Sequence, residues 1–471
     1  MFAPGNPVNY ILDREGGVAL VYSVGPDGDD DGGIKNLWGY YFEPGTPDGD
    51  IVVKVNKENL EKLYHPRNAS SENIDKTTDP FLKKILEMKA EDGMDNALIN
   101  YQQASKMMPD VPNNFQTEMI ARVLKEGWNE DAESLLPYIK IWNPALTEIR
   151  KGVEVGYAQN PHCEGPSTPV PNFLFAQISA KILCVEGNYL ESGGEYKDAL
   201  EDYMTALNMG RDYAAPDALL IGHLISIAIE QIATRQIYEL AVSGIPDVPT
   251  LESIIVRLWA VENGHPDMVS AFENEAECMR WVFRKMKTDD PQFGTEKMAQ
   301  ALKEQYGTDV SEDIHTLADT LLEHHKKFWD NELEYIRKPY WERNPEEHGQ
   351  EREKIVQQSH PFLKVALPNF MEADVRYLHK TVNLRKARIA AALAIYRARN
   401  GRFPASLSEL TPDILQELPK DPFSGKNFKY EAKKNGASFE LYSIGPDRIN
   451  NDSSPKYDPT NGTVSGGDIL Y

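Results

Sequence analysis

Residues 442–447 read Tyr-Ser-Ile-Gly-Pro-Asp, and residues 22–27, which lie 420 positions earlier, read Tyr-Ser-Val-Gly-Pro-Asp. Three flanking pairs keep this offset: Gly5 and Gly425, Tyr10 and Tyr430, and Gly16 and Gly436. After a small difference in length the match resumes, with Asp50-Ile51-Val52 against Asp468-Ile469-Leu470. A constant offset over several separated residues indicates that one small β unit occurs at both ends of the chain.

The N-terminal copy occupies residues 1–55. Strand-like runs at 9–12 and 18–24 flank Glu15-Gly16-Gly17, which is a hairpin signal, and a Gly-, Pro- and Asp-rich loop follows. At the offset of 420, Met1 corresponds to Asp421, so this copy lacks a helix of its own. An isolated hairpin is marginally stable in water. We therefore expect the N-terminal unit to pack against the C-terminal unit or against another chain.

Length and composition describe a globular chain of two or three domains. It has 471 residues, of which 41% are hydrophobic and 26% are charged. A net charge of −23 makes nucleic acid and anionic membrane surfaces poor partners. No apolar run approaches the length of a membrane span, and the first residues do not follow the signal-peptide pattern. We therefore expect no membrane contact through this chain.

The chain has three cysteines, Cys163, Cys184 and Cys278. Their odd number and wide spacing suggest neither a zinc site nor a disulfide framework. The sequence predicts buried free thiols.

Residues 56–370 are predicted to be helical. The clearest pair of helices lies within 172–240, where Gly187, Gly194 and Ala199 would let two helices approach closely and aromatic residues such as Tyr203 would fill the gaps. This spacing resembles a tetratricopeptide-type (TPR-like) helical hairpin, although one copy does not predict a regular array. The apolar run 221–233 predicts a central, buried helix.

Residues 371–471 form the last predicted domain. A helix over 374–400 would end at Gly401, and strands are expected at 428–432 and 438–444. The whole chain is therefore predicted to be α+β, with three parts: a short β unit (1–55), a large multi-helix domain (56–370) and a small α+β domain (371–471).

Four stretches of the last domain occur in a distinctive order. They are Tyr-Arg-Ala-Arg-Asn-Gly-Arg-Phe-Pro (396–404), Leu-Pro-Lys-Asp-Pro-Phe (418–423), Phe-Glu-Leu-Tyr-Ser-Ile-Gly-Pro-Asp (439–447) and Gly-Asp-Ile (467–469). This order resembles the globular domain of the major pseudopilin (protein G) of type II secretion systems. The apolar N-terminal helix of that family has no counterpart here. The whole chain also resembles bacterial proteins of unestablished activity that join a helical domain to a pseudopilin-like tail.

The resemblance implies a calcium-binding loop near the C-terminus. Asp447 and Asp468 match the family's ligands, and Asn450 and Asp452 are further candidates. Calcium takes six to eight oxygen ligands, which such a loop supplies. In the N-terminal copy the candidates are Asp27, Asp29, Asp31 and Asp50, whose mutual repulsion a divalent cation would relieve. The alternative is that Gly, Asp and Asn are present because turns favour them.

The motifs of metalloproteases, phosphate-binding loops, nucleophile elbows and dinucleotide sites do not occur in the sequence. We expect a non-enzymatic, envelope-associated or extracytoplasmic bacterial protein. It would be a helical interaction scaffold with calcium-stabilised pseudopilin-like ends, which bind protein partners or further copies through their β units. The alternatives are a pseudopilus-related component of type II secretion and a hydrolase whose site lies in the helical domain.

Overall fold

The computed structural model describes residues 9–13, 18–23, 51–56, 79–165, 167–288, 314–360, 363, 371–457 and 467–470. The chain separates into two compact units, Met1–Ile74 and Asp75–Tyr471. The first unit contains a three-stranded antiparallel sheet in the order β1-β2-β3. Its strands are β1 (Asn9–Asp13), β2 (Val18–Ser23) and β3 (Ile51–Asn56).

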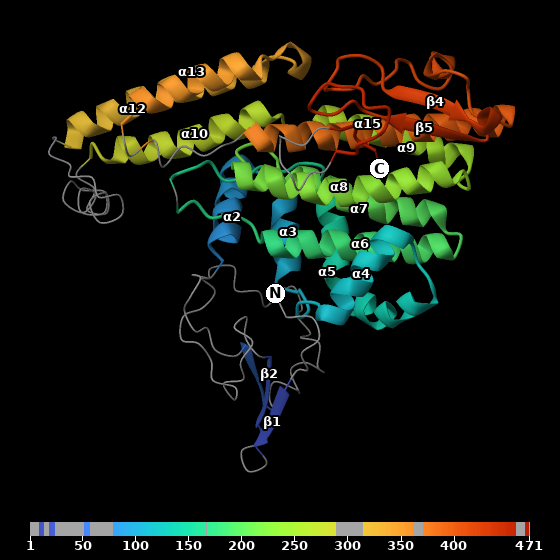
Figure 1. The fold of residues 1–471 in the computed structure, drawn as a ribbon. Helices are drawn as coiled ribbons and strands as arrows, with labels where there is room; N and C mark the ends of the chain where they lie inside the picture. Colours follow the sequence, from blue (N-terminus) through green and yellow to red (C-terminus); the bar gives the residue numbers. More distant parts are fainter. Residues whose placement is uncertain are drawn as a thin grey trace. The chain divides into compact units, whose positions relative to one another are not determined.

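The described part of the second unit is mostly helical, with a small antiparallel sheet near the C-terminus (Figure 1). This composition agrees with the α+β class predicted from the sequence. The helices are α2 (Pro80–Asp92), α3 (Ala97–Ser105), α4 (Asn114–Glu126), α5 (Leu136–Val155), α6 (Phe173–Ser192), α7 (Tyr196–Tyr213), α8 (Leu220–Ser243), α9 (Val248–Gly264), α10 (Met268–Lys285), α12 (Ile314–Arg337), α13 (Pro345–Gln358) and α15 (Met371–Asn400). Short 3-10 helices are η2 (Glu130–Leu135), η3 (Tyr340–Glu342), η4 (Leu407–Leu410) and η5 (Lys434–Gly436), and the strands are β4 (Lys429–Lys433) and β5 (Ser438–Tyr442).

The centre of the second unit is a stack of long helices. α7 packs between α6 and α8, and α15 packs against α8 and α9 (Figure 1). The buried helix predicted over 221–233 lies within α8, where Ile229, Ala233 and Ile237 are fully buried. Ile221, at the start of α8, is 45% exposed, so the predicted burial does not extend to this residue.

α6 and α7 form the hairpin expected within 172–240. The side chain of Asn172 caps α6 by accepting a hydrogen bond from the backbone N–H of Phe175, and Gly194 turns the chain with a φ of +86°. A Cβ on Gly187 would lie 2.3 Å from the ring of Tyr203. The close approach predicted for these small and aromatic residues is therefore present at Gly187 and Tyr203.

α15 is buried on two sides. On one side it contributes to the large helical core, and on the other to the core of the C-terminal region; the respective residues are Leu384, Ala387, Ala391 and Val382, Ile389, Leu393. The second of these cores also contains Phe403, Phe423, Phe428 and Leu441. α15 ends as predicted at Gly401, which has a φ of +75° and donates its N–H to the carbonyl of Arg397. The division of the chain at residues 55 and 370 stays a prediction.

The hairpins at the two ends of the chain have the same pairing register. In β1–β2, Asn9 pairs with Tyr22 and Tyr10 with Val21; in β4–β5, Lys429 pairs with Tyr442 and Tyr430 with Leu441. The next strand also corresponds, because Ser23 pairs with Ile51 and Ser443 pairs with Ile469. The repeat found in the sequence is therefore a repeat of backbone pairing as well.

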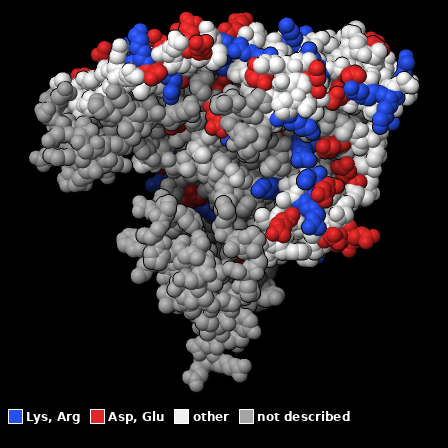
Figure 2. Space-filling view, viewed as in Figure 1, with Lys and Arg blue, Asp and Glu red and all other residues white. Residues whose placement is uncertain are grey.

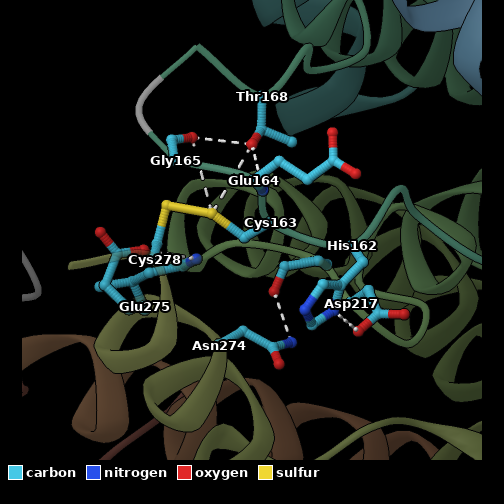
Figure 3. Close-up of a disulfide and its surroundings, with 11 residues drawn as sticks. His162, Cys163, Glu164, Gly165, Thr168, Asp217, Asn274, Glu275 and Cys278 are labelled. Carbon is cyan, nitrogen blue, oxygen red and sulfur yellow. Dashed lines mark hydrogen bonds and ion pairs between the residues drawn. A yellow bond between two sulfur atoms is a disulfide. The ribbon is translucent and has the colours of Figure 1, made fainter. Parts of the chain in front are cut away.

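The prediction of free thiols is wrong for two of the three cysteines. Cys163, in the loop after α5, forms a disulfide with Cys278 of α10 (Figure 3). Thr168 closes the Cys163 loop by donating a hydrogen bond to the carbonyl of Gly165 at 2.7 Å. The loop also lies against α10, since a Cβ on Gly165 would lie 2.4 Å from the Trp281 ring. Spacing could not predict the pair, because 115 positions separate the two cysteines and the fold brings them together.

We predict that Gly187→Ala destabilises the second unit by about 1–3 kcal/mol, because the added methyl group would overlap the buried Tyr203 ring. Gly193→Ala is the matched control. Gly193 ends the same helix with a φ of −82°, and the nearest atom to its Cβ would be 3.4 Å away. Urea unfolding followed by circular dichroism gives both free energies. Equal stability of the two variants would contradict the close packing of α6 on α7.

We predict that the double substitution Cys163→Ser/Cys278→Ser lowers the free energy of unfolding by about 2–5 kcal/mol, as expected for a bond that closes a long loop. Dithiothreitol should lower the melting temperature of the unsubstituted protein to about that of the double variant. The melting temperature of the double variant should not change with dithiothreitol. Non-reducing peptide mapping that found both thiols free in the oxidised protein would contradict the disulfide.

Candidate metal centre

Backbone pairing brings the two ends of the C-terminal loop together. β5 leads into Ser443, which pairs with Ile469, so that Asp447 and Asp468 lie at the base of the loop between them. Gly445 has a φ of +73°, and a Cβ there would lie 2.3 Å from the carbonyl oxygen of Gly467. Glycine is therefore required where the two chain segments cross. The glycine of the Gly-Pro-Asp sequence at 445–447 thus has a structural cause.

Asp447 accepts hydrogen bonds from both sides of the loop. Its Oδ1 accepts from the backbone N–H of Ile449 at 2.9 Å, and its Oδ2 accepts from that of Gly467 at 2.8 Å. Asn451 Nδ2 donates to the same Oδ2 at 3.3 Å. These bonds hold the Asp447 carboxylate at the closure of the loop.

Asp468 is fully buried, and only one of its oxygens has partners among the described residues. Oδ2 accepts from the backbone N–H groups of Ser453 at 2.7 Å and Asn451 at 3.1 Å. Oδ1 is buried without a hydrogen-bond partner in the described part of the chain. Burial raises the pKa of Asp468; the two backbone hydrogen bonds oppose this shift, and the negative charges of Asp447 and Asp452 add to it.

Asn450 and Asp452 form a hydrogen bond with one another in this loop. Asn450 accepts a hydrogen bond from the Tyr442 hydroxyl at 3.1 Å and donates to Asp452 Oδ1 at 2.8 Å. Arg448, Asp452 and Ser453 have φ values of +59°, +51° and +65°. Non-glycine residues rarely adopt this region. The loop therefore has an unusual backbone path at these three residues.

The donor set fits calcium in part. Calcium accepts carboxylate, amide and backbone oxygens together. Asp468 offers an unpartnered buried oxygen beside the negative charge of Asp447, which is the environment that a cation stabilises. The described side chains nevertheless include no group of three or more His, Cys, Asp or Glu residues placed to hold a metal ion. Asp447 and Asp468 are thus the core of the candidate site, and amide and backbone oxygens would have to complete it.

The candidates of the N-terminal copy, Asp27, Asp29, Asp31 and Asp50, lie outside the described residues. The shared register places the pairing of Ser23 with Ile51 where Ser443 pairs with Ile469 in the C-terminal copy. A calcium site in the N-terminal copy stays a prediction.

A buried cluster of charged residues between α8, α15 and the C-terminal end of α9 was not predicted as a unit. Glu230 Oε1 lies 2.6 Å from His265 Nε2, and Glu230 Oε2 lies 3.4 Å from Lys380 Nζ. The Ser226 hydroxyl donates to Glu230 Oε1 at 2.7 Å. Burial alone would raise the pKa of Glu230, but the charges of His265 and Lys380 lower it to about 2.

The geometry of this cluster does not activate Ser226 as a nucleophile. His265 Nδ1 lies 2.6 Å from the carbonyl oxygen of Pro266, and His265 Nε2 lies 2.6 Å from Glu230 Oε1 and 3.2 Å from Ser226 Oγ. The Ser226 hydroxyl donates its hydrogen to Glu230, and all three side chains are buried in the core. The neighbouring His223 is neutral, because burial lowers its pKa to about 3. The cluster therefore links the helices through buried side chains, in which the negative charge of Glu230 lies beside Lys380 and His265.

Comparison of the chain with protein-family models, with curated proteins and with solved structures finds no significant match. Within the described ranges, no helix is both long enough and apolar enough to cross a membrane.

We predict that calcium raises the melting temperature of the protein. At a calcium concentration of a hundred times its Kd, the free energy of unfolding should increase by about 2.7 kcal/mol. The gain should be larger at pH 7 than at pH 4. The raised pKa of Asp468 means that the cation-free fold loses stability as the pH rises from about 3.9, where an unfolded Asp titrates, through the folded-state value. A bound cation removes that loss.

Asp468→Asn should abolish most of the calcium-induced rise in melting temperature at pH 7. Asp413→Asn is the matched control, because Asp413 is exposed and makes no ion pair with the described residues. Differential scanning calorimetry with calcium and with a chelator measures both effects. Identical melting temperatures in the two conditions at pH 7 would contradict a calcium site in either copy.

Proposed function

We propose that this chain is a non-enzymatic, extracytoplasmic or envelope-associated bacterial protein. Its helical part acts as an interaction scaffold, and its two ends are pseudopilin-like modules stabilised by calcium. The single observation that carries the proposal is the repeated β unit, in which both hairpins and the following pairing share one register.

The β units supply the means of association. Among the described residues, β4 pairs only with β5, and β1 pairs only with β2. An outer strand with unpaired backbone groups can accept a strand from a partner. A second copy of this chain carries the complementary unit at its other end, which suits end-to-end association between copies. Calcium would strengthen this association by fixing the loops that follow the hairpins.

Two further features support the proposal. A disulfide such as Cys163–Cys278 persists in oxidising compartments and is rare in the cytosol, which favours a place outside the cytoplasm. The contact of α6 with α7, with Gly187 under the Tyr203 ring, is compatible with the proposed TPR-like helix pair. Surfaces of such helix pairs serve as binding platforms in repeat proteins.

The alternative of a hydrolase has less support. It would be favoured by a pocket with clustered acidic and histidine side chains. The Ser226, Glu230 and His265 side chains instead meet inside the core, where the Ser226 hydroxyl donates to Glu230. We therefore propose a binding role and assign no catalytic residue.

Sedimentation velocity of the full chain tests the proposal. We expect a concentration-dependent shift to larger species in calcium, and a smaller shift in chelator. Asp447→Asn/Asp468→Asn should lose the calcium dependence, and Asp413→Asn should retain it. A chain that stays monomeric at every concentration in both conditions would exclude self-association through the β units.

A further inference from the structure

A groove of about 530 Å³ lies between α4, α6 and α8 in the second unit. Its floor is apolar and is formed by one isoleucine from each helix: Ile120, Ile178 and Ile232. Ile120 and Ile178 are buried, so the floor is part of the main helical core. Its size lies in the range of small-molecule sites in proteins, roughly 300–1,000 Å³.

The same three helices each place one cation in the lining of the groove. These residues are Lys125 of α4, Lys181 of α6 and Arg235 of α8. In both α6 and α8 the cation follows the floor isoleucine by three residues, so the charge and the apolar side chain share one helix face. No acidic residue of the described chain lines the groove. We refer to this site as the cationic groove.

The three cations have no protein partner among the described residues. None of them makes an ion pair or a side-chain hydrogen bond with any residue that the structure describes. Other basic residues of the described chain do find carboxylates. Arg150, for example, contacts Glu186 at 2.8 Å and Asp202 at 2.6 Å. On the face seen in Figure 2, basic side chains likewise lie beside acidic ones.

Three like charges beside an apolar surface define the ligand that would fit. The charges repel one another, and an anion between them would relieve the repulsion. The apolar floor gains free energy when hydrocarbon covers it. One molecule satisfies both conditions when it has an anionic head and a short hydrocarbon tail.

We propose that the cationic groove binds a small amphipathic carboxylate. The hydrocarbon tail lies on Ile120, Ile178 and Ile232, and the carboxylate lies among Lys125, Lys181 and Arg235. This proposal uses no residue of the calcium loops or of the β units, so it holds or fails independently of the proposed function. The size of the groove favours a small molecule over a helix of a protein partner, which would need a longer apolar channel.

Isothermal titration with decanoate, below its micellar concentration, tests the proposal on the full chain. We expect decanoate to bind at one site, and both 1-decanol and acetate to bind about tenfold more weakly or not at all, since each lacks one of the two recognised parts. Binding of decanoate should weaken as the salt concentration rises. Equal affinity for decanoate and 1-decanol would overturn the role of the cations.

Substitutions separate this site from other exposed apolar surface. Lys181→Gln/Arg235→Gln should weaken decanoate binding by about tenfold, a loss typical of two partly exposed charges. Lys140→Gln, at an exposed cation of α5 without an ion pair in the described chain, should bind as the unsubstituted protein does.

Ala121→Trp tests the groove by filling it. Ala121 is an exposed lining residue, so the larger side chain should block the groove without disturbing the core, and circular dichroism checks that the variant is folded. Loss of binding in the folded variant is expected. Undiminished binding in either Ala121→Trp or the double variant would overturn the proposal. It would also be overturned if decanoate failed to bind the unsubstituted protein while a Glu-rich amphipathic peptide bound it.

Discussion

The burial of α15 on two sides is the constraint on which the second unit depends. One side packs on α8 and α9 within the large helical core, and the other packs on the apolar side chains around β4 and β5. A helix buried in this way must also bury polar side chains, and each then needs a partner. Lys380 lies 3.4 Å from Glu230 of α8, and Lys386 donates to the carbonyl of Ile469 at 3.3 Å. α15 therefore joins the helical core to the C-terminal region by packing and by charge.

The contact with Ile469 places α15 directly behind the candidate metal centre. Ile469 pairs with Ser443, and it follows Asp468 in the chain. The backbone that follows Asp468 is thus held from two sides: Ile469 pairs with Ser443, and its carbonyl accepts a hydrogen bond from Lys386, a buried lysine whose pKa burial lowers to about 7. The matching register of Ser23 with Ile51 shows that the sheet side of this arrangement is a property of the repeat itself. The contact from Lys386, in contrast, comes from α15.

The elements that the sequence predicted well are those set by local or repeated signals. The helix that stops at Gly401 depends on one glycine with a positive φ, and the two hairpins depend on matched positions that can be compared along one chain. The Cys163–Cys278 pair and the cationic groove depend on which helices become neighbours. Lys125, Lys181 and Arg235 are ordinary surface residues in the sequence, and only the packing of α4, α6 and α8 makes them a group. In the loop, the sequence predicted Asp447 and Asp468 as a pair of ligands. The hydrogen bond between Asn450 and Asp452 depends on the backbone path of the loop, which the sequence does not show.

Two buried carboxylates, Glu230 and Asp468, supply the argument for the proposed cation in the C-terminal loop. Glu230 receives hydrogen bonds from Ser226 and His265 and faces Lys380, so the fold itself supplies the positive charge that keeps it ionised. Asp468 receives two backbone N–H groups on one oxygen, has no partner for the other among the described residues, and has acidic neighbours. A buried carboxylate is stabilised by a nearby positive charge or by a proton. For Asp468 a proton neutralises one carboxylate, whereas a divalent cation also reduces its repulsion with Asp447. This difference is the basis of the calcium proposal at neutral pH, where protons are scarce.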